Sequence, residues 1–292
     1  MKNKTKIFLL VIAIIIVIIA VFLLLYSLKP FPDDYETFSG MRKDLTESLS
    51  VAGAAERDIN GYFNEYNLNL NPLYSFMFRN SHLSLYLKSY QSKIIDTGTI
   101  SQFEIGDTGI FFDFTFMIRP REQYSLPFFH GDALKALPGV DGALYMDFYS
   151  FENTMDLDAF FGQNVELIER AMKLAAPYWK HEGFGELTAH LDEYKSPYRF
   201  EILEPEKVAE DERAEYFKTV RECFNLYSNA YLNSLKAHEA DESLEDAALN
   251  SAEINGFVDI LYEHDIAVRM GKMIFPEEDF DRYFLEGFWG VR

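Results

Sequence analysis

Cysteine is almost absent from the 292-residue chain, which contains only Cys223. A lone thiol has no partner for an intrachain disulfide and cannot build a multi-cysteine zinc cluster. Cys223 lies in an apolar stretch with helical spacing, the usual setting of a buried, unreactive thiol. The sequence therefore excludes the small disulfide-stabilised folds and gives no indication of thiol chemistry.

Motifs of the common enzyme classes are missing as well. The chain has no glycine-rich phosphate loop, no G-x-S-x-G, no H-E-x-x-H and no dinucleotide-binding fingerprint after a strand. His181 and His190 have acidic neighbours, but their spacing matches no common metal site. We predict that the protein binds no metal, and the motifs alone leave its function open.

Positive charge is scarce, because 27 Lys and Arg residues face 47 Asp and Glu residues and the formal net charge is −20. Lys2, Lys4 and Lys6 precede the long apolar run described next, so the remainder of the chain is more acidic still. An acidic surface repels phosphate groups. Nucleic acid and anionic lipid are therefore poor partners.

One hydrophobic run is long: residues 7–28 are uncharged and rich in Ile, Leu and Val. A helix of about 20 apolar residues spans a bilayer, and no small-residue cleavage site follows the run. We predict that residues 1–29 form a signal anchor, a single transmembrane helix with a short basic N-terminus. Since the basic flank of a span tends to stay cytoplasmic, the charge bias places the globular domain outside the cytoplasm.

Residues 30–90 are predicted to form a helical stalk with further N-terminal helices. Apolar residues recur every three or four positions between Phe38 and Leu49, which predicts a helix over about 34–59. A second helix is expected over about 72–90, beginning with a proline in its first turn.

Residues 91–292 are predicted to form the globular domain. Short aromatic or β-branched runs between Gly, Pro or charged turns predict antiparallel strands, and helical spacing follows them. This order predicts an α+β fold, a three-layer α/β/α sandwich around a central, mainly antiparallel sheet. The expected strands cover about 93–106, 109–119, 124–132, 142–151 and 198–203, and the expected helices cover 157–178, 205–235, 260–270 and a last one from residue 276.

Two pairs of polar side chains alternate with apolar residues on the predicted strands. Asp113 and Thr115 are two residues apart, as are His130 and Asp132, so each pair leaves one face of the sheet. A carboxyl group among aromatic rings loses hydration, which raises its pKa and lets it act as an acid near neutral pH. Asp132 is thus a candidate proton donor; the alternative is a turn aspartate that accepts hydrogen bonds from local backbone.

Residues 117–132, with the sequence MIRPREQYSLPFFHGD, resemble the central signature of the ferredoxin-dependent bilin reductases. In that family an apolar strand ends near a proline, a charged turn with an aromatic residue follows, and Leu-Pro and further apolar residues lead to a catalytic aspartate. Residues 265–284 resemble the closing helices of the same family. The resemblance covers about residues 90–292 and implies the same α/β/α sandwich.

The resemblance also implies roles for single residues. Asp132 takes the place of the family's proton-donating aspartate, and Glu104 matches its pocket glutamate when one residue is deleted from the following turn. Thr115 stands where relatives have a histidine or an asparagine; it can donate a hydrogen bond but is no acid near neutral pH. Asp113 and His130 are further residues expected to contact the ligand.

The implied activity is the reduction of a linear tetrapyrrole, such as biliverdin, by single electrons from ferredoxin. Members of the family need no flavin or metal, so reduced ferredoxin is the expected external donor and no bound cofactor is expected. Ferredoxin would require a cytoplasmic domain, whereas the charge bias favours the other side, so the side of the membrane stays open. Two alternatives remain: a membrane-tethered tetrapyrrole-binding module without catalysis, and an extracytoplasmic interaction domain.

Overall fold

The computed structural model describes residues 33–57, 71–77, 83–105, 111–135, 143–151, 154–178, 189–202, 208–239 and 251–290. The expected membrane anchor, residues 7–28, lies outside the described residues. Within the described ranges, no helix is both long enough and apolar enough to cross a bilayer.

A seven-stranded sheet forms the middle of the molecule, and its strands lie side by side in the order in which they follow along the chain. Every neighbouring pair is antiparallel, which confirms the predicted α+β class and the antiparallel sheet. The strands are β1 (Ala55–Arg57), β2 (Leu83–Gln91), β3 (Ile95–Ile105), β4 (Phe111–Pro120), β5 (Phe128–Lys135), β6 (Ala143–Tyr149) and β7 (Phe200–Ile202).

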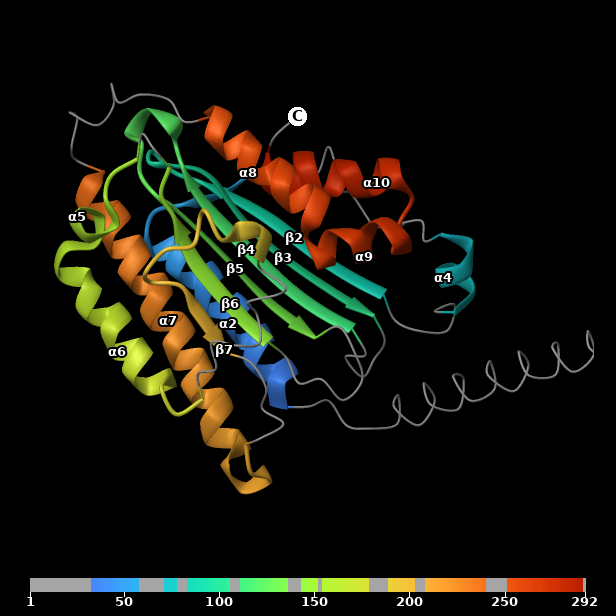
Figure 1. Ribbon diagram of the computed structural model, residues 1–292, viewed down its shortest axis with the longest axis horizontal. Coiled ribbons are helices and arrows are strands. Elements are labelled where there is room, and N and C mark those ends of the chain that lie inside the picture. The colour runs from blue at the N-terminus through green and yellow to red at the C-terminus, as the bar shows by residue number, and fades with distance from the viewer. Residues whose placement is uncertain are drawn as a thin grey trace, which may run out of the picture.

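Helices cover both faces of this sheet (Figure 1). The first face carries α2 (Asp33–Val51), α5 (Leu157–Phe161), α6 (Val165–Ala175) and α7 (Arg213–His238). The second face carries α8 (Ser251–His264), α9 (Ile266–Ile274), α10 (Glu277–Asp281) and the π-helix η7 (Arg282–Trp289). The short α4 (Pro72–Met77) lies beside the end of α9, where the side-chain amide of Asn71 donates to the carbonyl of Met273 at 2.7 Å.

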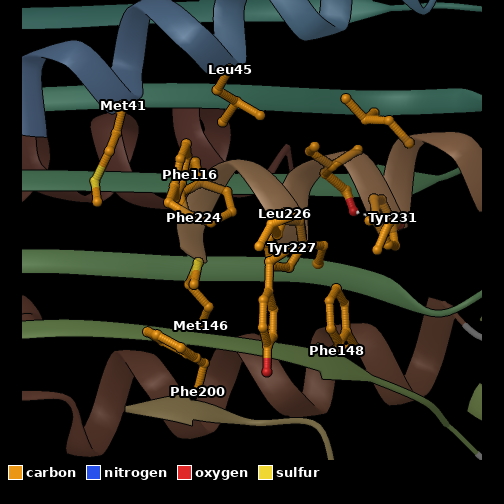
Figure 2. Close-up of a cluster of buried hydrophobic side chains, with 14 of the residues drawn as sticks. Met41, Leu45, Phe116, Met146, Phe148, Phe200, Phe224, Leu226, Tyr227 and Tyr231 are labelled. Carbon is orange, nitrogen blue, oxygen red and sulfur yellow. Dashed lines mark hydrogen bonds between the residues drawn. The ribbon is translucent and has the colours of Figure 1, made fainter. Parts of the chain in front are cut away.

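The face under α2 and α7 is an aromatic core (Figure 2). Alternate residues of β4 and β5 point into it, and Phe116 and Phe129 are fully buried there. The ring of Phe116 packs edge-on against Phe129 and against Phe224 of α7, with centroids 4.8 Å and 5.4 Å away. Tyr231 of α7 donates its hydroxyl proton to the carbonyl of Pro127 at 2.7 Å. These contacts fix α7 against the start of β5.

The helix predicted over residues 72–90 is present as α4 over its first six residues and is wrong from Leu83 onwards. Residues 83–91 form strand β2, in which Leu87 lies opposite Ser101 of β3. Leu85 and Leu87 face one side of the sheet and Tyr86 the other, so the true period is two. The run is short and apolar on both sides, and such runs do not distinguish a strand from a helix by spacing alone.

Helix α2 packs into the core and does not stand apart as a stalk. Phe38, Met41 and Leu45 are buried against the sheet and α7. The guanidinium of Arg221 on α7 donates two hydrogen bonds of 2.7 Å to the carboxylate of Asp44 on α2. Helix α2 therefore belongs to the helical layer that packs on the first face of the sheet.

Candidate active site

The opposite face of the same strands is polar at its centre. In the β4–β5 register, Thr115 lies opposite Asp132, and Met117 lies opposite His130. Side chains alternate along a strand, so Asp113, two residues before Thr115, leaves the sheet on the same face as these residues. Four of the five predicted site residues are thus brought together, and we call them the floor.

The C-terminal elements α8, α9, α10 and η7 form a roof over the floor (Figure 1). They pack on the sheet through two apolar clusters. Between floor and roof is a cavity of about 60 Å³. Its walls come from β4, β5 and every roof element: Asp113, Thr115, His130, Asp132, Leu261, Asp265, Ala267, Val268, Phe280, Tyr283, Phe284, Phe288 and Trp289.

A second cavity, of about 40 Å³, adjoins the first and is more apolar. Asp113 and Tyr283 line both cavities, whereas Asp132 lines the first and not the second. The hydroxyl groups of Ser101 on β3 and Tyr283 on η7 share a hydrogen bond of 2.6 Å. The roof is thus attached to the sheet beside the wall between the cavities.

Thr115 bridges the two carboxyl groups of the floor. Its hydroxyl oxygen lies 2.9 Å from Oδ1 of Asp113 and 3.0 Å from Oδ1 of Asp132. Burial raises the pKa of Asp113, and burial together with the nearby charge of Asp113 raises the pKa of Asp132 well above its usual range. The floor therefore keeps a carboxyl proton to a higher pH than an aspartate in water does.

Asp265, at the junction of α8 and α9, brings a third carboxyl group to the cavity. Its Oδ1 accepts hydrogen bonds from the backbone N–H groups of Ala267 at 2.6 Å and Val268 at 3.4 Å, so Asp265 caps α9. Burial raises the pKa of Asp265 despite these bonds. His190 Nε2 lies 3.9 Å from its Oδ2, and burial lowers the pKa of His190, which favours a neutral imidazole there.

His130 lies between the ring of Tyr149 on β6 and the ring of Trp289 in the roof. Its ring centroid lies 6.2 Å from that of Tyr149 and 5.4 Å from that of Trp289. Burial lowers the pKa of His130 to about 3, so the imidazole is neutral at physiological pH. Within the described part of the chain, neither His130 Nδ1 nor Trp289 Nε1 has a hydrogen-bond partner. Both groups line the cavity and can hydrogen-bond a ligand.

Asp147 lies opposite His130 in the β5–β6 register and is fully buried. It accepts hydrogen bonds from the backbone N–H groups of Phe148 at 2.8 Å and Ser196 at 3.1 Å, and from the hydroxyl groups of Ser196 and Tyr145. Burial raises the pKa of Asp147 to about 7, although these bonds favour the ionised form. This carboxyl group therefore titrates near neutral pH without lining the cavity.

Glu104 is not part of the floor. In the β3–β4 register Phe103 lies opposite Asp113, and Glu104 is one residue further along β3. Its side chain therefore leaves the sheet on the α2 side, where it accepts a hydrogen bond from the amide of Gln102. The sheet separates Glu104 from Asp132, so the structure does not bring together the two acids that the resemblance implies.

Sequence reasoning missed Asp147, Asp265 and the aromatic side chains of the roof. Asp147 alternates with Tyr145 and Tyr149, a pattern that could have placed it on the polar face. An aspartate just before an apolar helical stretch is a helix-capping signal, which could have located Asp265. No local signal shows that α8 to η7 fold back over the floor.

Metal binding finds no support in the described geometry. His181, one of the two histidines considered as a metal pair, lies outside the described residues. Across the ranges that the structure describes, no three His, Cys, Asp or Glu side chains are grouped so as to hold a metal ion. The site instead offers buried carboxyl groups, a neutral imidazole and an indole N–H among aromatic rings. Such a site can hold a proton and release it to a bound molecule.

Comparison with protein-family models finds no match, and neither does comparison with curated protein sequences. Among solved structures, the chain is similar to a crystal structure of phytochromobilin synthase from tomato in complex with biliverdin, with a TM-score of 0.52 and 12% sequence identity. The similarity covers 84% of this chain and 80% of the tomato chain. At this level of identity the two proteins share a fold.

Proposed function

We propose that the protein reduces a linear tetrapyrrole, with ferredoxin as the single-electron donor and Asp132 as the proton donor. The observation that carries the proposal is the position of Asp132, whose raised pKa keeps a proton available in an aromatic cavity. The fold shared with a protein whose structure contains biliverdin supports the choice of a tetrapyrrole. A flat conjugated ligand also suits a cavity lined by Phe284, Phe288 and Trp289.

The described conformation is closed. Pockets for ligands of drug size or larger measure about 300–1,000 Å³, whereas the cavity between floor and roof measures about 60 Å³. A tetrapyrrole therefore requires the roof to move away from the floor. The hydroxyl bond between Ser101 and Tyr283 would break in that motion, and the aromatic side chains of η7 would pack on the ligand.

The other floor residues have supporting roles in this proposal. His130 has a pKa of about 3, so it accepts or donates a hydrogen bond and does not act as an acid near neutral pH. Trp289 Nε1 supplies a second donor beside it. Thr115 and Asp113 hold the carboxyl group of Asp132 in place.

Docking of the electron donor is limited by charge. Ferredoxins are generally acidic. Four basic side chains of this domain could attract an acidic ferredoxin, but each already contacts a carboxylate or a carbonyl group of the same chain. Arg119 pairs with Asp96 at 2.7 Å, and Arg282 lies 3.4 Å from Asp279. The other two are Arg121 and Lys272, which donate to backbone carbonyls. We expect weak, salt-dependent docking, with the domain on the cytoplasmic side of the membrane.

The test is an absorption titration of the full chain in detergent with biliverdin, followed by anaerobic addition of reduced ferredoxin. We expect binding and a shift of the absorption bands on reduction, and we expect Asp132→Asn to bind but not to turn over. Asp192→Asn, on an exposed residue, serves as the matched control and should behave like the wild type. No binding of biliverdin by the wild type would overturn the proposal.

A tetrapyrrole-binding module without catalysis is the second candidate. Thr115 favours it, because a hydroxyl group cannot supply the acid that a histidine supplies at this position in relatives. Binding of biliverdin without reduction, by ferredoxin or by a chemical reductant of low potential, would select this candidate.

A further inference from the structure

Two short contacts at Thr115 constrain the protons of the floor. The threonine hydroxyl has one proton and two lone pairs, so it can donate to one oxygen and accept from another. Its oxygen is 2.9 Å from Asp113 Oδ1 and 3.0 Å from Asp132 Oδ1. If both carboxyl groups were ionised, one of these contacts would bring an oxygen anion against a lone pair with no proton between them. Both contacts are hydrogen bonds only when one carboxyl group carries a proton.

We propose that Asp113 and Asp132 share one proton through the hydroxyl group of Thr115, and that Asp113 reloads Asp132 through this relay during reduction. The shared proton is a property of the ligand-free protein. The reloading step rests on the proposed function, because it needs a substrate that removes the proton from Asp132.

The surroundings of the pair favour a single negative charge. Of the residues that the structure describes, the titratable groups that face it are His130 on β5, Tyr145 and Tyr149 on β6, Asp265 before α9, Asp279 on α10 and Tyr283 on η7. Among the described residues, no lysine or arginine lines either cavity. Nothing cationic in these walls compensates two ionised carboxyl groups side by side, and the carboxyl group before α9 adds to the repulsion.

The two cavities give the relay a direction. Asp132 lines the larger cavity, where the ligand would lie, and Asp113 lines both. The smaller cavity extends towards α9 and α10 through Gly271 and Asp279. Water that reaches the floor from this side meets Asp113 first. A proton can therefore enter at Asp113 and leave at Asp132.

The relay balances with the proposed reduction. Reducing one double bond takes two electrons from ferredoxin and two protons. In each transfer the O–H bond of Asp132 breaks and its proton goes to the tetrapyrrole, which leaves both carboxyl groups ionised. Asp113 then takes one proton from water, and as this proton passes to the hydroxyl oxygen of Thr115, the hydroxyl proton of Thr115 moves to Asp132. Thr115 ends each cycle unchanged, and the cycle runs twice per double bond.

Infrared difference spectra of the ligand-free full chain test the shared proton. At pH 7 the C=O band of the protonated carboxyl group should change in frequency or disappear in Asp113→Asn and also in Asp132→Asn, since each change removes one of the two groups that share the proton through Thr115. A band that keeps its wild-type frequency and intensity in either variant would overturn the sharing. Asp147 and Asp265 are present in every variant, so their bands cancel.

Turnover of the bilin tests the relay. Proton transfer by a positioned group contributes about 10²–10⁴-fold to rate, so Thr115→Val should lower kcat by about 100-fold with KM unchanged. Thr115→Ser keeps the hydroxyl group and should retain a rate close to that of the wild type. Equal rates for the valine and serine variants would overturn the relay. If the wild type does not reduce a bilin, the proposed function fails while the infrared result still decides on the shared proton.

Discussion

The two faces of strands β4 and β5 differ in packing and polarity, although they are built from alternate residues of the same backbone. On one face Phe114, Phe116 and Phe129 are fully buried in the aromatic core. On the other face Asp113 and Asp132 meet at a hydroxyl group beside a cavity. One face is filled completely, and the other keeps space and charge.

This contrast shows how the site is positioned. The packed face cannot shift by fractions of an ångström without loss of contacts, because protein interiors are close to crystal density. The backbone that it holds in place also sets the distances from Thr115 to its two carboxyl neighbours. The aromatic core therefore fixes the geometry of the polar site through the shared backbone, without contacting the carboxyl groups.

The largest effect is expected from emptying the packed face. Phe116→Ala removes a ring that contacts Phe129 and Phe224, and truncation of a buried phenylalanine costs about 3–5 kcal/mol of unfolding free energy. Urea denaturation followed by circular dichroism measures it. The control is Met273→Ala on an exposed residue, which should stay within about 0.5 kcal/mol of the wild type. Equal losses in both variants would contradict the central role of this face.

The polar face should make stability depend on pH. The folded pKa of Asp147 is about 7, above its ordinary value of 3.8, so the folded state binds more protons than the unfolded state between these values. Stability from this group is therefore present at acidic pH and is lost as pH rises towards 7, by about 2–4 kcal/mol. Urea midpoints measured from pH 4.5 to 7.5 should fall less steeply for Asp147→Asn than for the wild type.

His130 should act in the opposite direction on the same face. Its pKa is lowered from 6.5 to about 3, so the folded state binds fewer protons than the unfolded state between these values. Stability from a neutral His130 is present above about pH 6.5 and is lost on acidification, by about 2 kcal/mol at pH 5. His130→Gln should flatten this acidic slope in the same urea series. Relative to the wild type, the two variants should change the slope of stability against pH in opposite directions. A change in the same direction for His130→Gln and Asp147→Asn would show that the two groups do not titrate as their burial indicates.

Gly131 lies on β5 between His130 and Asp132, opposite Phe116 on the packed face. A Cβ atom added there would lie 2.4 Å from the ring of Phe116 and 2.9 Å from the carbonyl oxygen of Tyr145. Gly131→Ala should cost about 1–3 kcal/mol through overpacking. Gly256→Ala on α8 is the matched control, since nothing lies within 4 Å of its added Cβ, and it should gain up to about 1 kcal/mol from helix propensity. Thermal melting compares the two; a neutral Gly131→Ala would mean that the strands can separate at this point.

The smallest effect is expected outside both faces, where α2 meets α7. Asp44 accepts two hydrogen bonds of 2.7 Å from Arg221, a partly exposed pair. Asp44→Asn should cost about 1 kcal/mol, near the upper end for pairs in contact with water. The loss should shrink in high salt, which urea titrations with and without added salt would detect. If Asp44→Asn lowered the unfolding free energy as much as Phe116→Ala, ion pairs would stabilise the molecule as strongly as its core packing.

The period-two alternation on β4 and β5 made both faces of these strands predictable from the sequence. It pairs Asp113 with Thr115 and His130 with Asp132, and the register of β4 against β5 then brings the two pairs to one face. The antiparallel order of the sheet followed from the short runs between turns. Local patterns therefore predicted which side chains share a face of each strand, and the strand register brings them together.

The remainder depends on contacts that local patterns do not contain. Glu104 was assigned from a gapped match, and a difference of one residue along β3 moves a side chain through the sheet. The apolar residues of β2 fit both the strand period and the helix period, so their spacing does not reveal the strand. Asp265 reaches the cavity only through the packing of α8 and α9 on the second face. Register and long-range packing, and not composition, decide these positions.

The hydrogen bond between Ser101 and Tyr283 joins residues that are 182 positions apart in the chain. Ribosomes make the floor strands first and the roof much later, and contacts over such separations form slowly. Until the roof arrives, water can reach Asp113 and Asp132, so the burial that raises the pKa of both carboxyl groups is reduced. A nascent chain stalled between β7 and α8 would therefore display a complete sheet with an ionised, open site. We therefore expect the floor to take up its proton only when the roof packs on it.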